Sequence, residues 1–157
     1  MIDLGEYARL LGYPYGRELE GDVLVRARES IAWYERHGRP HVCIRDGVAA
    51  FTAGYEIERE VERRWAEDRV DEAYFLDRLG AVVVEQLARA HPHESPGTGT
   101  RPLEEQFDLV ARLGPEAPLD ILPSGMLRPV NSLVAVLTDD ATSCSDCGYP
   151  CVYRRVG

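Results

Sequence analysis

The sequence predicts an α+β protein built around an antiparallel sheet. Apolar residues recur at helical spacing in several segments, short apolar runs between them have the length of strands, and two of these runs join through a tight turn. The chain has 157 residues, no internal repeat and no linker long enough to separate two domains. We therefore expect residues 1–157 to form a single domain.

The first part of the chain predicts two helices and a hairpin. Asp3 and Glu6 have the spacing of a capping box and open a short helix. Helical apolar spacing continues over residues 19–37, and Gly38 can end that helix. Residues 41–51 form two short apolar runs around an Asp-Gly pair, which is typical of a hairpin turn.

Two more helices are expected in the middle of the chain. Residues 54–66 are highly charged and carry one apolar stripe, formed by Ile57, Val61 and Trp65. Residues 71–91 follow, with Asp71 as the candidate cap. This helix is the most apolar of the chain, and its Ala-Val-Val-Val run indicates burial on more than one side. Its main stripe comprises Leu76, Leu79, Val83 and Leu87.

The last part predicts a loop, a helix and two strands. Residues 91–102 are rich in proline and glycine, so we expect irregular structure. Pro102 suits the first turn of a helix that ends at Gly114. Its expected core side comprises Leu103, Phe107, Val110 and Leu113. Strands are expected at 119–122 and 132–137, joined by the segment 123–131.

Composition excludes several classes of function. The net charge of −9 argues against nucleic acid or an anionic membrane as the main partner. No apolar run approaches the roughly 20 residues of a spanning helix, and the acidic N-terminus does not resemble a secretory signal, so we expect a cytoplasmic protein. All 18 basic residues are arginine. Without lysine, no Schiff base with pyridoxal phosphate can form, and the usual P-loop and kinase lysines are absent.

The C-terminal tail, about residues 142–157, is rich in cysteine. Cys144, Cys147 and Cys151 have the spacing of thiolate ligands for zinc or an iron–sulfur cluster. Three thiolates are an incomplete set, so Cys43, a histidine, a substrate or a partner must supply the fourth ligand. A redox dithiol and a reduced, partly buried clasp are the alternatives. Cys43, inside an expected strand, is most simply a core residue.

The segment from His93 to Arg101 is the strongest candidate for a ligand site. Gly97 and Gly99 permit close backbone approach to a ligand, Ser95 and its neighbouring threonines offer hydroxyls, and Arg101 is a carboxylate clamp. These features fit a small molecule that bears a carboxylate; the alternative is an ordinary surface turn. His93 and the nearby His91 suit a general base or a metal pair, or are simply solvated. Tyr55, after a glycine at a strand-to-helix junction, is a second candidate base.

Three segments resemble a known family. SPGTGTRPLEEQFDLV, DILPSGMLRPVNSLVAV and the terminal CSDCGYPC are similar to the activation domain of cobalamin-dependent methionine synthase, above all to its small stand-alone relatives. The similarity runs in order along nearly the whole chain. It implies a curved antiparallel sheet flanked by helices. It also implies S-adenosylmethionine as ligand, held by backbone and side chains of the SPG loop. The site residues that follow for this chain are Ser95, Pro96, Gly97, Thr98, Gly99 and Arg101.

The chain also departs from this family pattern. Thr98 stands where the family has a loop tyrosine near the corrin, and His93 or Arg101 takes the place of an arginine before the loop. In the long central helix, Ala81 stands where methionine synthase has an acidic residue, and Glu85 follows one turn later. These departures favour an enzyme that consumes S-adenosylmethionine by itself.

Two functions from different classes therefore stand side by side. In the first, a lyase or cyclase releases methylthioadenosine and forms 1-aminocyclopropane-1-carboxylate or azetidine-2-carboxylate, with Tyr55 or His93 as base, Glu85 holding the ammonium group and Arg101 the carboxylate. In the second, an accessory protein supplies S-adenosylmethionine for reductive reactivation of a corrinoid protein. A non-catalytic sensor with a metal-bound tail is a third alternative. The sequence is also compatible with a homodimer.

Overall fold

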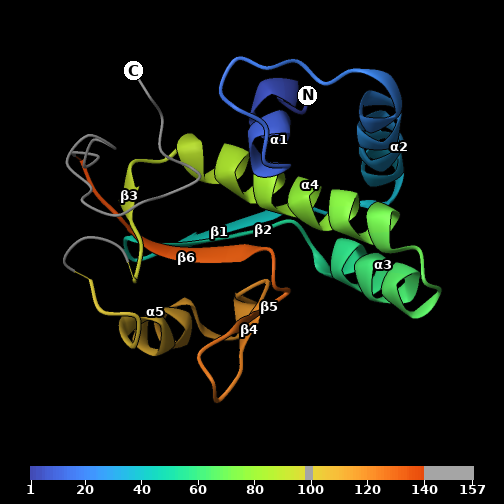
Figure 1. The fold of residues 1–157 in the computed structure, drawn as a ribbon. Coiled ribbons are helices and arrows are strands. Elements are labelled where there is room, and N and C mark those ends of the chain that lie inside the picture. The colour runs from blue at the N-terminus through green and yellow to red at the C-terminus, as the bar shows by residue number, and fades with distance from the viewer. Residues whose placement is uncertain (98–100, 140–157) are drawn as a thin grey trace.

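The computed structural model describes residues 1–97 and 101–139, which adopt an α+β fold (Figure 1). This part of the chain forms five α-helices and a small antiparallel sheet, which confirms the predicted class. The helices are α1 (Leu4–Leu10), α2 (Gly21–His37), α3 (Tyr55–Ala66), α4 (Val70–Arg89) and α5 (Glu105–Leu113), and a short 3₁₀ turn covers Gly114–Glu116. The strands are β1 (His41–Arg45), β2 (Val48–Thr52), β3 (His93–Glu94), β4 (Asp120–Ile121), β5 (Leu127–Arg128) and β6 (Ser132–Leu137).

The main sheet has the strand order β1-β2-β6-β3, and each neighbouring pair is antiparallel. The predicted hairpin is confirmed as β1 and β2, with Cys43 opposite Ala50. Thr52 lies opposite Ser132 at one end of β6, and His93 lies opposite Leu137 at the other end. Strands β4 and β5 pair separately as a two-stranded sheet.

The sheet separates two hydrophobic cores, because successive side chains of a strand point to opposite faces. On one face, Ala49 and Phe51 of β2 pack with apolar side chains of α1, α2 and α4. On the other face, Val48 and Ala50 pack with Leu109 and its neighbours on α5. Figure 1 shows α4 above the sheet and α5 below it. Cys43 is half-buried against the second core, as its expected core position predicts.

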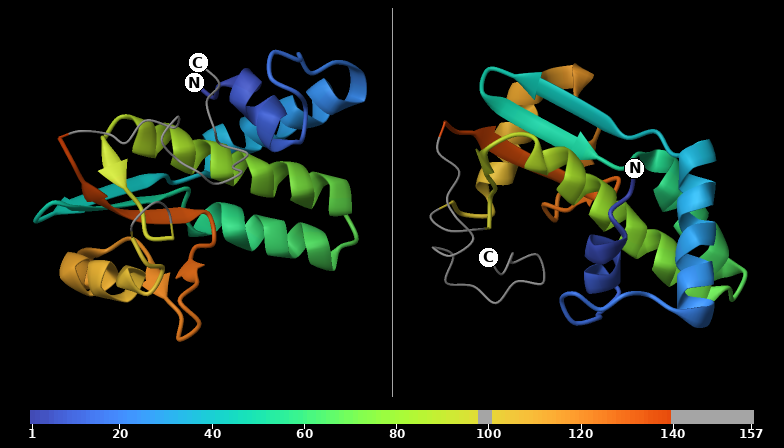
Figure 2. Two further views of the ribbon diagram at one scale, coloured as in Figure 1. Left: turned by 60° about the vertical axis from the view of Figure 1, so that its left-hand side comes forward. Right: turned by 90° about the horizontal axis from the view of Figure 1, so that it is seen from above.

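Helix α4 is buried on several sides. Its predicted stripe residues Leu76, Leu79 and Val83 lie in the core, and so do Val82 and Val84. Figure 2 shows α4 running along the sheet, with α1 and α2 on its outer side. The Ala-Val-Val-Val run of α4 therefore lies between the apolar side chains of the sheet and those of α1 and α2. The helix begins at Val70, so Asp71 lies in its first turn rather than at the predicted cap.

Predictions for the start of α5 and for the buried sides of α3 and α5 are wrong in part. Helix α5 begins at Glu105 rather than next to Pro102, because the N–H of Glu105 donates to the Pro102 carbonyl at 3.2 Å in a tight turn. Leu103, before the helix, and Phe107 are exposed rather than part of the core, which α5 reaches through Leu109 and Leu113. Trp65 is also exposed, because the buried side of α3 at this level is occupied by Arg64.

Two segments without a predicted strand contain strand residues. Strand β3 lies within the expected loop, because His93 and Glu94 pair with the open edge of β6. Strand β5 lies within the segment 123–131, opposite a β4 that is shorter than the predicted 119–122 strand. At the N-terminus, the Asp3 carboxylate accepts the N–H groups of Gly5 and Glu6 and so caps α1 as predicted.

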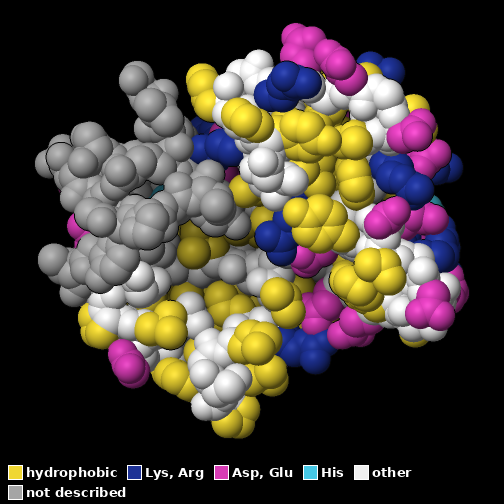
Figure 3. Space-filling model, in the orientation of Figure 1, with side chains coloured by type: hydrophobic (Ala, Val, Ile, Leu, Met, Phe, Trp, Pro, Cys, Tyr) yellow, Lys and Arg dark blue, Asp and Glu magenta, His cyan; other side chains and the backbone are white. Residues whose placement is uncertain are grey.

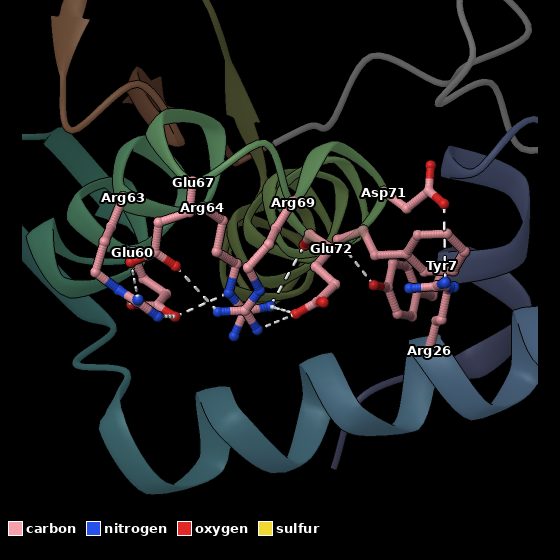
Figure 4. A network of polar contacts seen from close by, with 10 residues as sticks. Tyr7, Arg26, Glu60, Arg63, Arg64, Glu67, Arg69, Asp71 and Glu72 are labelled. Atoms are coloured by element: carbon pink, nitrogen blue, oxygen red, sulfur yellow. Dashed lines mark hydrogen bonds and ion pairs between the residues drawn. The ribbon is translucent and has the colours of Figure 1, made fainter.

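A network of ion pairs connects α3 with α4 and reaches α2 (Figure 4). Glu60 accepts hydrogen bonds from Arg63 and Arg64, and Arg64 also lies over the ring of Trp33 on α2. The hydrogen bond from Arg63, together with that from Arg64, lowers the pKa of Glu60 to about 2. The network thus places a buried arginine against a carboxylate that stays ionised well below neutral pH.

Among residues 1–97 and 101–139, no helix has the length and apolar character needed to cross a membrane.

Candidate functional site

The candidate ligand segment begins at the edge of the main sheet. Residues 93 and 94 pair with β6, and the chain then turns towards the start of α5. Ser95 and Pro96 are buried behind this turn, whereas Gly97 is exposed. The sheet edge and the buried pair therefore fix the base of the loop and present Gly97 to solvent.

Gly97 has a left-handed backbone conformation with φ of 79°. Residues with a Cβ atom rarely adopt this region, so the position favours glycine. The N–H of Gly97 donates to the carbonyl of Arg101 at 2.9 Å, which closes the turn. A Cβ atom at Gly97 would also lie 3.4 Å from the side chain of Leu103. The predicted need for glycine is thus supported by geometry at Gly97.

Arg101 lies between two carboxylates. Its Nε donates to Glu94 at 3.0 Å, and its Nη1 lies 2.8 and 3.0 Å from the two oxygens of Glu105. The hydrogen bond to Glu105, with that to Glu94, raises the pKa of Arg101. A carboxylate of a ligand would have to share this guanidinium with Glu94 and Glu105. Together the three side chains carry a net charge of about −1, which attracts a cation.

His93 and His91 lie side by side against the core. Their rings have centroids 6.0 and 5.6 Å from that of Phe51. The Nδ1 atom of His93 lies 2.7 Å from the carbonyl oxygen of His91. Because a carbonyl only accepts, this contact places a proton on Nδ1, and in the neutral ring the lone pair is then on Nε2. The neutral form of His93 therefore has the tautomer that a general base acting through Nε2 requires.

Tyr55 lies at the other end of the sheet. It follows β2 at the end where Thr52 pairs with Ser132, whereas His93 pairs with the opposite end of β6, a span of roughly 16 Å for a six-residue strand. The Tyr55 hydroxyl donates to Asp120 at 2.6 Å. Burial, followed by this hydrogen bond, raises the pKa of Tyr55 to about 12. The structure does not bring the two candidate bases together, and it keeps this phenol protonated at neutral pH.

Glu85 lies on α4, one turn before the helix ends at Arg89, and is partly buried. Ala81, one turn earlier, is partly buried against the first core. Both therefore belong to the helix that leads into the candidate segment.

Several predicted site residues lie outside the described part of the chain. They are Thr98 and Gly99 of the loop, and Cys144, Cys147 and Cys151 of the tail. Among the described residues, no group of three or more histidine, cysteine, aspartate or glutamate side chains is arranged to bind a metal ion. The predicted metal site in the tail stays a prediction.

Sequence reasoning missed the two partners of Arg101. Glu105 follows Arg101 by four residues at a helix start, and that spacing is a recognisable signal for an ion pair. Glu94 carries no comparable signal, because its contact depends on how the loop closes.

No family model matches the sequence, and no curated protein matches it either.

Proposed function

We propose that the protein binds S-adenosylmethionine through residues 93–101 and that its fold is the curved, helix-flanked sheet of methionine synthase activation domains. The observation that carries this proposal is Gly97, which is exposed, has φ of 79° and follows the buried Ser95 and Pro96. Backbone without a side chain at such a turn lets a ligand approach closely. The SPGTG and PLEEQ motifs resemble those of methionine synthase activation domains, and this resemblance is the reason for proposing S-adenosylmethionine as the ligand.

The charges at the turn suit this ligand. S-adenosylmethionine has a positive sulfonium, an ammonium group and a carboxylate. The carboxylates of Glu94 and Glu105 outnumber the guanidinium of Arg101, so the site attracts the positive groups. In the proposal, the ligand's carboxylate binds Arg101 beside its present partners, and Glu85 holds the ammonium group.

The enzymatic form of the proposal is a lyase or cyclase without pyridoxal phosphate. A base removes a proton from the α-carbon or from the ammonium group of the substrate. The freed electron pair attacks the γ-carbon, the bond from that carbon to sulfur breaks, and its electron pair stays on sulfur in methylthioadenosine. The products are 1-aminocyclopropane-1-carboxylate after carbon attack and azetidine-2-carboxylate after nitrogen attack. His93, whose neutral ring has its lone pair on Nε2, is the residue we assign as base.

The experiment is incubation of the pure protein with S-adenosylmethionine, without cobalamin, followed by mass spectrometry. The expected result is release of methylthioadenosine together with one cyclic amino acid. His93→Gln is expected to abolish release, and His41→Gln, at an exposed histidine of β1, serves as the matched control. Release no faster than the spontaneous rate from the wild-type protein would contradict the enzymatic proposal.

A second candidate function is supported by the surface beside the loop. Leu103 and Phe107 are exposed by 58% and 43%, and Met126 by 53%. Figure 3 shows hydrophobic side chains gathered over α5, β4 and β5. Such a surface suits the docking of a corrinoid protein that receives the methyl group. Restored turnover of an oxidised cobalamin-dependent methyltransferase, with this protein, S-adenosylmethionine and a reductant, would support the accessory function.

A further inference from the structure

A cavity of about 210 Å³ lies between α3, α4 and the chain that connects β4, β5 and β6. It is at the end of β6 opposite to residues 93–101, because Asn131 on its wall directly precedes Ser132. Apolar, charged and amide side chains share the lining. They are Glu58, Val61, Glu62, Asp77, Leu122, Met126, Arg128, Val130 and Asn131.

Glu58 fixes one wall of this cavity. Its side chain is 8% exposed, one carboxylate oxygen pairs with Arg128, and the other accepts the N–H of Val130 at 2.8 Å. The carbonyl of Arg128 in turn lies 3.0 Å from the hydroxyl of Tyr55. The arginine and the backbone beside it are therefore held in place without any ligand.

Asn131 is fixed on the wall next to α4. Its side-chain Nδ2 donates to Asp77 at 3.2 Å, and its carbonyl accepts the N–H of Ala53 at 3.0 Å. Gly80 makes room for this side chain, because a Cβ atom there would lie 2.5 Å from Nδ2. The amide is thus built into the wall, and its Oδ1 is an acceptor with no partner among the described residues.

Opposite charges meet at the mouth of the cavity. Arg128 pairs with both Glu58 and Glu62 through Nη2, so among the described residues Nε and Nη1 are left to donate. Glu62 is 62% exposed and pairs through one oxygen, which leaves the other to accept. A donor for a carboxylate and acceptors for an ammonium group therefore lie beside one another.

We propose that this cavity is a second binding site and that its ligand is a single apolar amino acid in zwitterionic form. The carboxylate binds Nη1 of Arg128, the ammonium group binds Glu62 and the Oδ1 of Asn131, and the side chain packs against Val61 and Met126. The volume is below the roughly 300–1,000 Å³ of sites for drug-sized ligands, which suits one amino acid rather than a nucleoside.

The proposal is independent of S-adenosylmethionine binding, because the two sites use different residues at opposite ends of β6. The test is NMR titration of the isotopically labelled full chain with three matched probes, in the absence of S-adenosylmethionine. The probes are L-leucine, isoamylamine, which lacks the carboxylate, and 4-methylpentanoate, which lacks the amine. L-leucine is expected to shift the side-chain amide signals of Asn131 and to bind at least fivefold more tightly than either half-molecule.

Two variants assign the ammonium position. Glu62→Gln keeps the shape of an exposed side chain and is expected to weaken L-leucine and isoamylamine at least fivefold, whereas 4-methylpentanoate is expected to bind at least as tightly as before, because Glu62 also pairs with Arg128. Glu104→Gln makes the same charge change at an exposed position outside the cavity and is expected to change none of the three. The proposal is overturned by failure of L-leucine to bind at millimolar concentration, by equally tight binding of either half-molecule, or by equal effects of the two variants.

Discussion

The Nη1 atom of Arg101 lies 2.8 and 3.0 Å from the two carboxylate oxygens of Glu105. This pairing joins the candidate loop to the start of α5, and Glu94 on β3 completes it from the other side. The guanidinium that the sequence predicts as a clamp for a ligand carboxylate thus also closes the loop. Its role in binding and its role in structure can be separated by measurement.

Replacing Arg101 tests that separation. Arg101→Gln is expected to lower the affinity for S-adenosylmethionine at least fivefold and to lower the free energy of unfolding by about 1 kcal/mol, the usual contribution of a partly exposed ion pair. Arg17→Gln, at an exposed arginine, is the control. Calorimetry measures the affinity and urea denaturation measures the stability. A loss of stability with unchanged affinity would assign Arg101 to the structure of the loop alone.

Tyr55 is expected to matter for stability and not for release of methylthioadenosine. Tyr55→Phe removes the hydrogen bond to Asp120, which is expected to cost about 1 kcal/mol in the free energy of unfolding. The raised pKa keeps the wild-type phenol protonated at neutral pH, so it is a poor base there. Single-turnover release should match that of the wild type. Abolished release with intact S-adenosylmethionine binding would instead identify Tyr55 as the base.

The ion pairs of Glu60 predict a stability that depends on acid pH. Glu60→Gln is expected to lower the free energy of unfolding at pH 7 by about 1–2 kcal/mol, since the pair includes the half-exposed Arg63. Because the pKa is depressed from 4.5 to about 2 in the folded chain, this contribution is present above pH 4.5 and is lost as the pH falls towards 2.

Urea denaturation across this pH range measures the effect, with Glu35→Gln, at an exposed residue of α2, as the control. A difference between Glu60→Gln and the wild type that stays constant from pH 7 to pH 2 would rule out this pair as its source.

The predicted metal site of the tail is testable by composition. If Cys144, Cys147 and Cys151 are ligands, protein purified without chelators contains close to stoichiometric zinc or iron, and Cys147→Ser loses most of it. Elemental analysis by mass spectrometry gives the ratio. Metal-free wild-type protein that keeps its full stability would leave the reduced clasp as the remaining interpretation.

The sequence predicts elements with strong periodicity and misses contacts set by tertiary pairing. The stripe of α4 and the Asp-Gly hairpin follow from local spacing, and both are confirmed. Strand β3 could not be predicted, because two residues carry no periodic signal and pair only where the edge of β6 is open. Spacing alone predicts that Trp65 is buried, whereas the buried position is occupied by Arg64, which packs over the ring of Trp33.

In the candidate site too, local features can be predicted from the sequence, whereas tertiary contacts cannot. The glycine requirement at Gly97 could be inferred from composition, because a loop that closes tightly needs a residue without a Cβ atom. The separation of Tyr55 from His93 depends on the register of β6, which no local pattern specifies.

Calorimetric titration with S-adenosylmethionine, comparing the wild type with Gly97→Val, tests the central claim most directly. Valine at φ of 79° is strained, and its side chain fills the turn that the ligand must approach. The wild type is expected to bind one equivalent, and Gly97→Val to bind at least tenfold more weakly, about 1.4 kcal/mol, while its circular dichroism shows a folded chain. Equal affinity in the two folded proteins, or no binding to the wild type, would contradict the account.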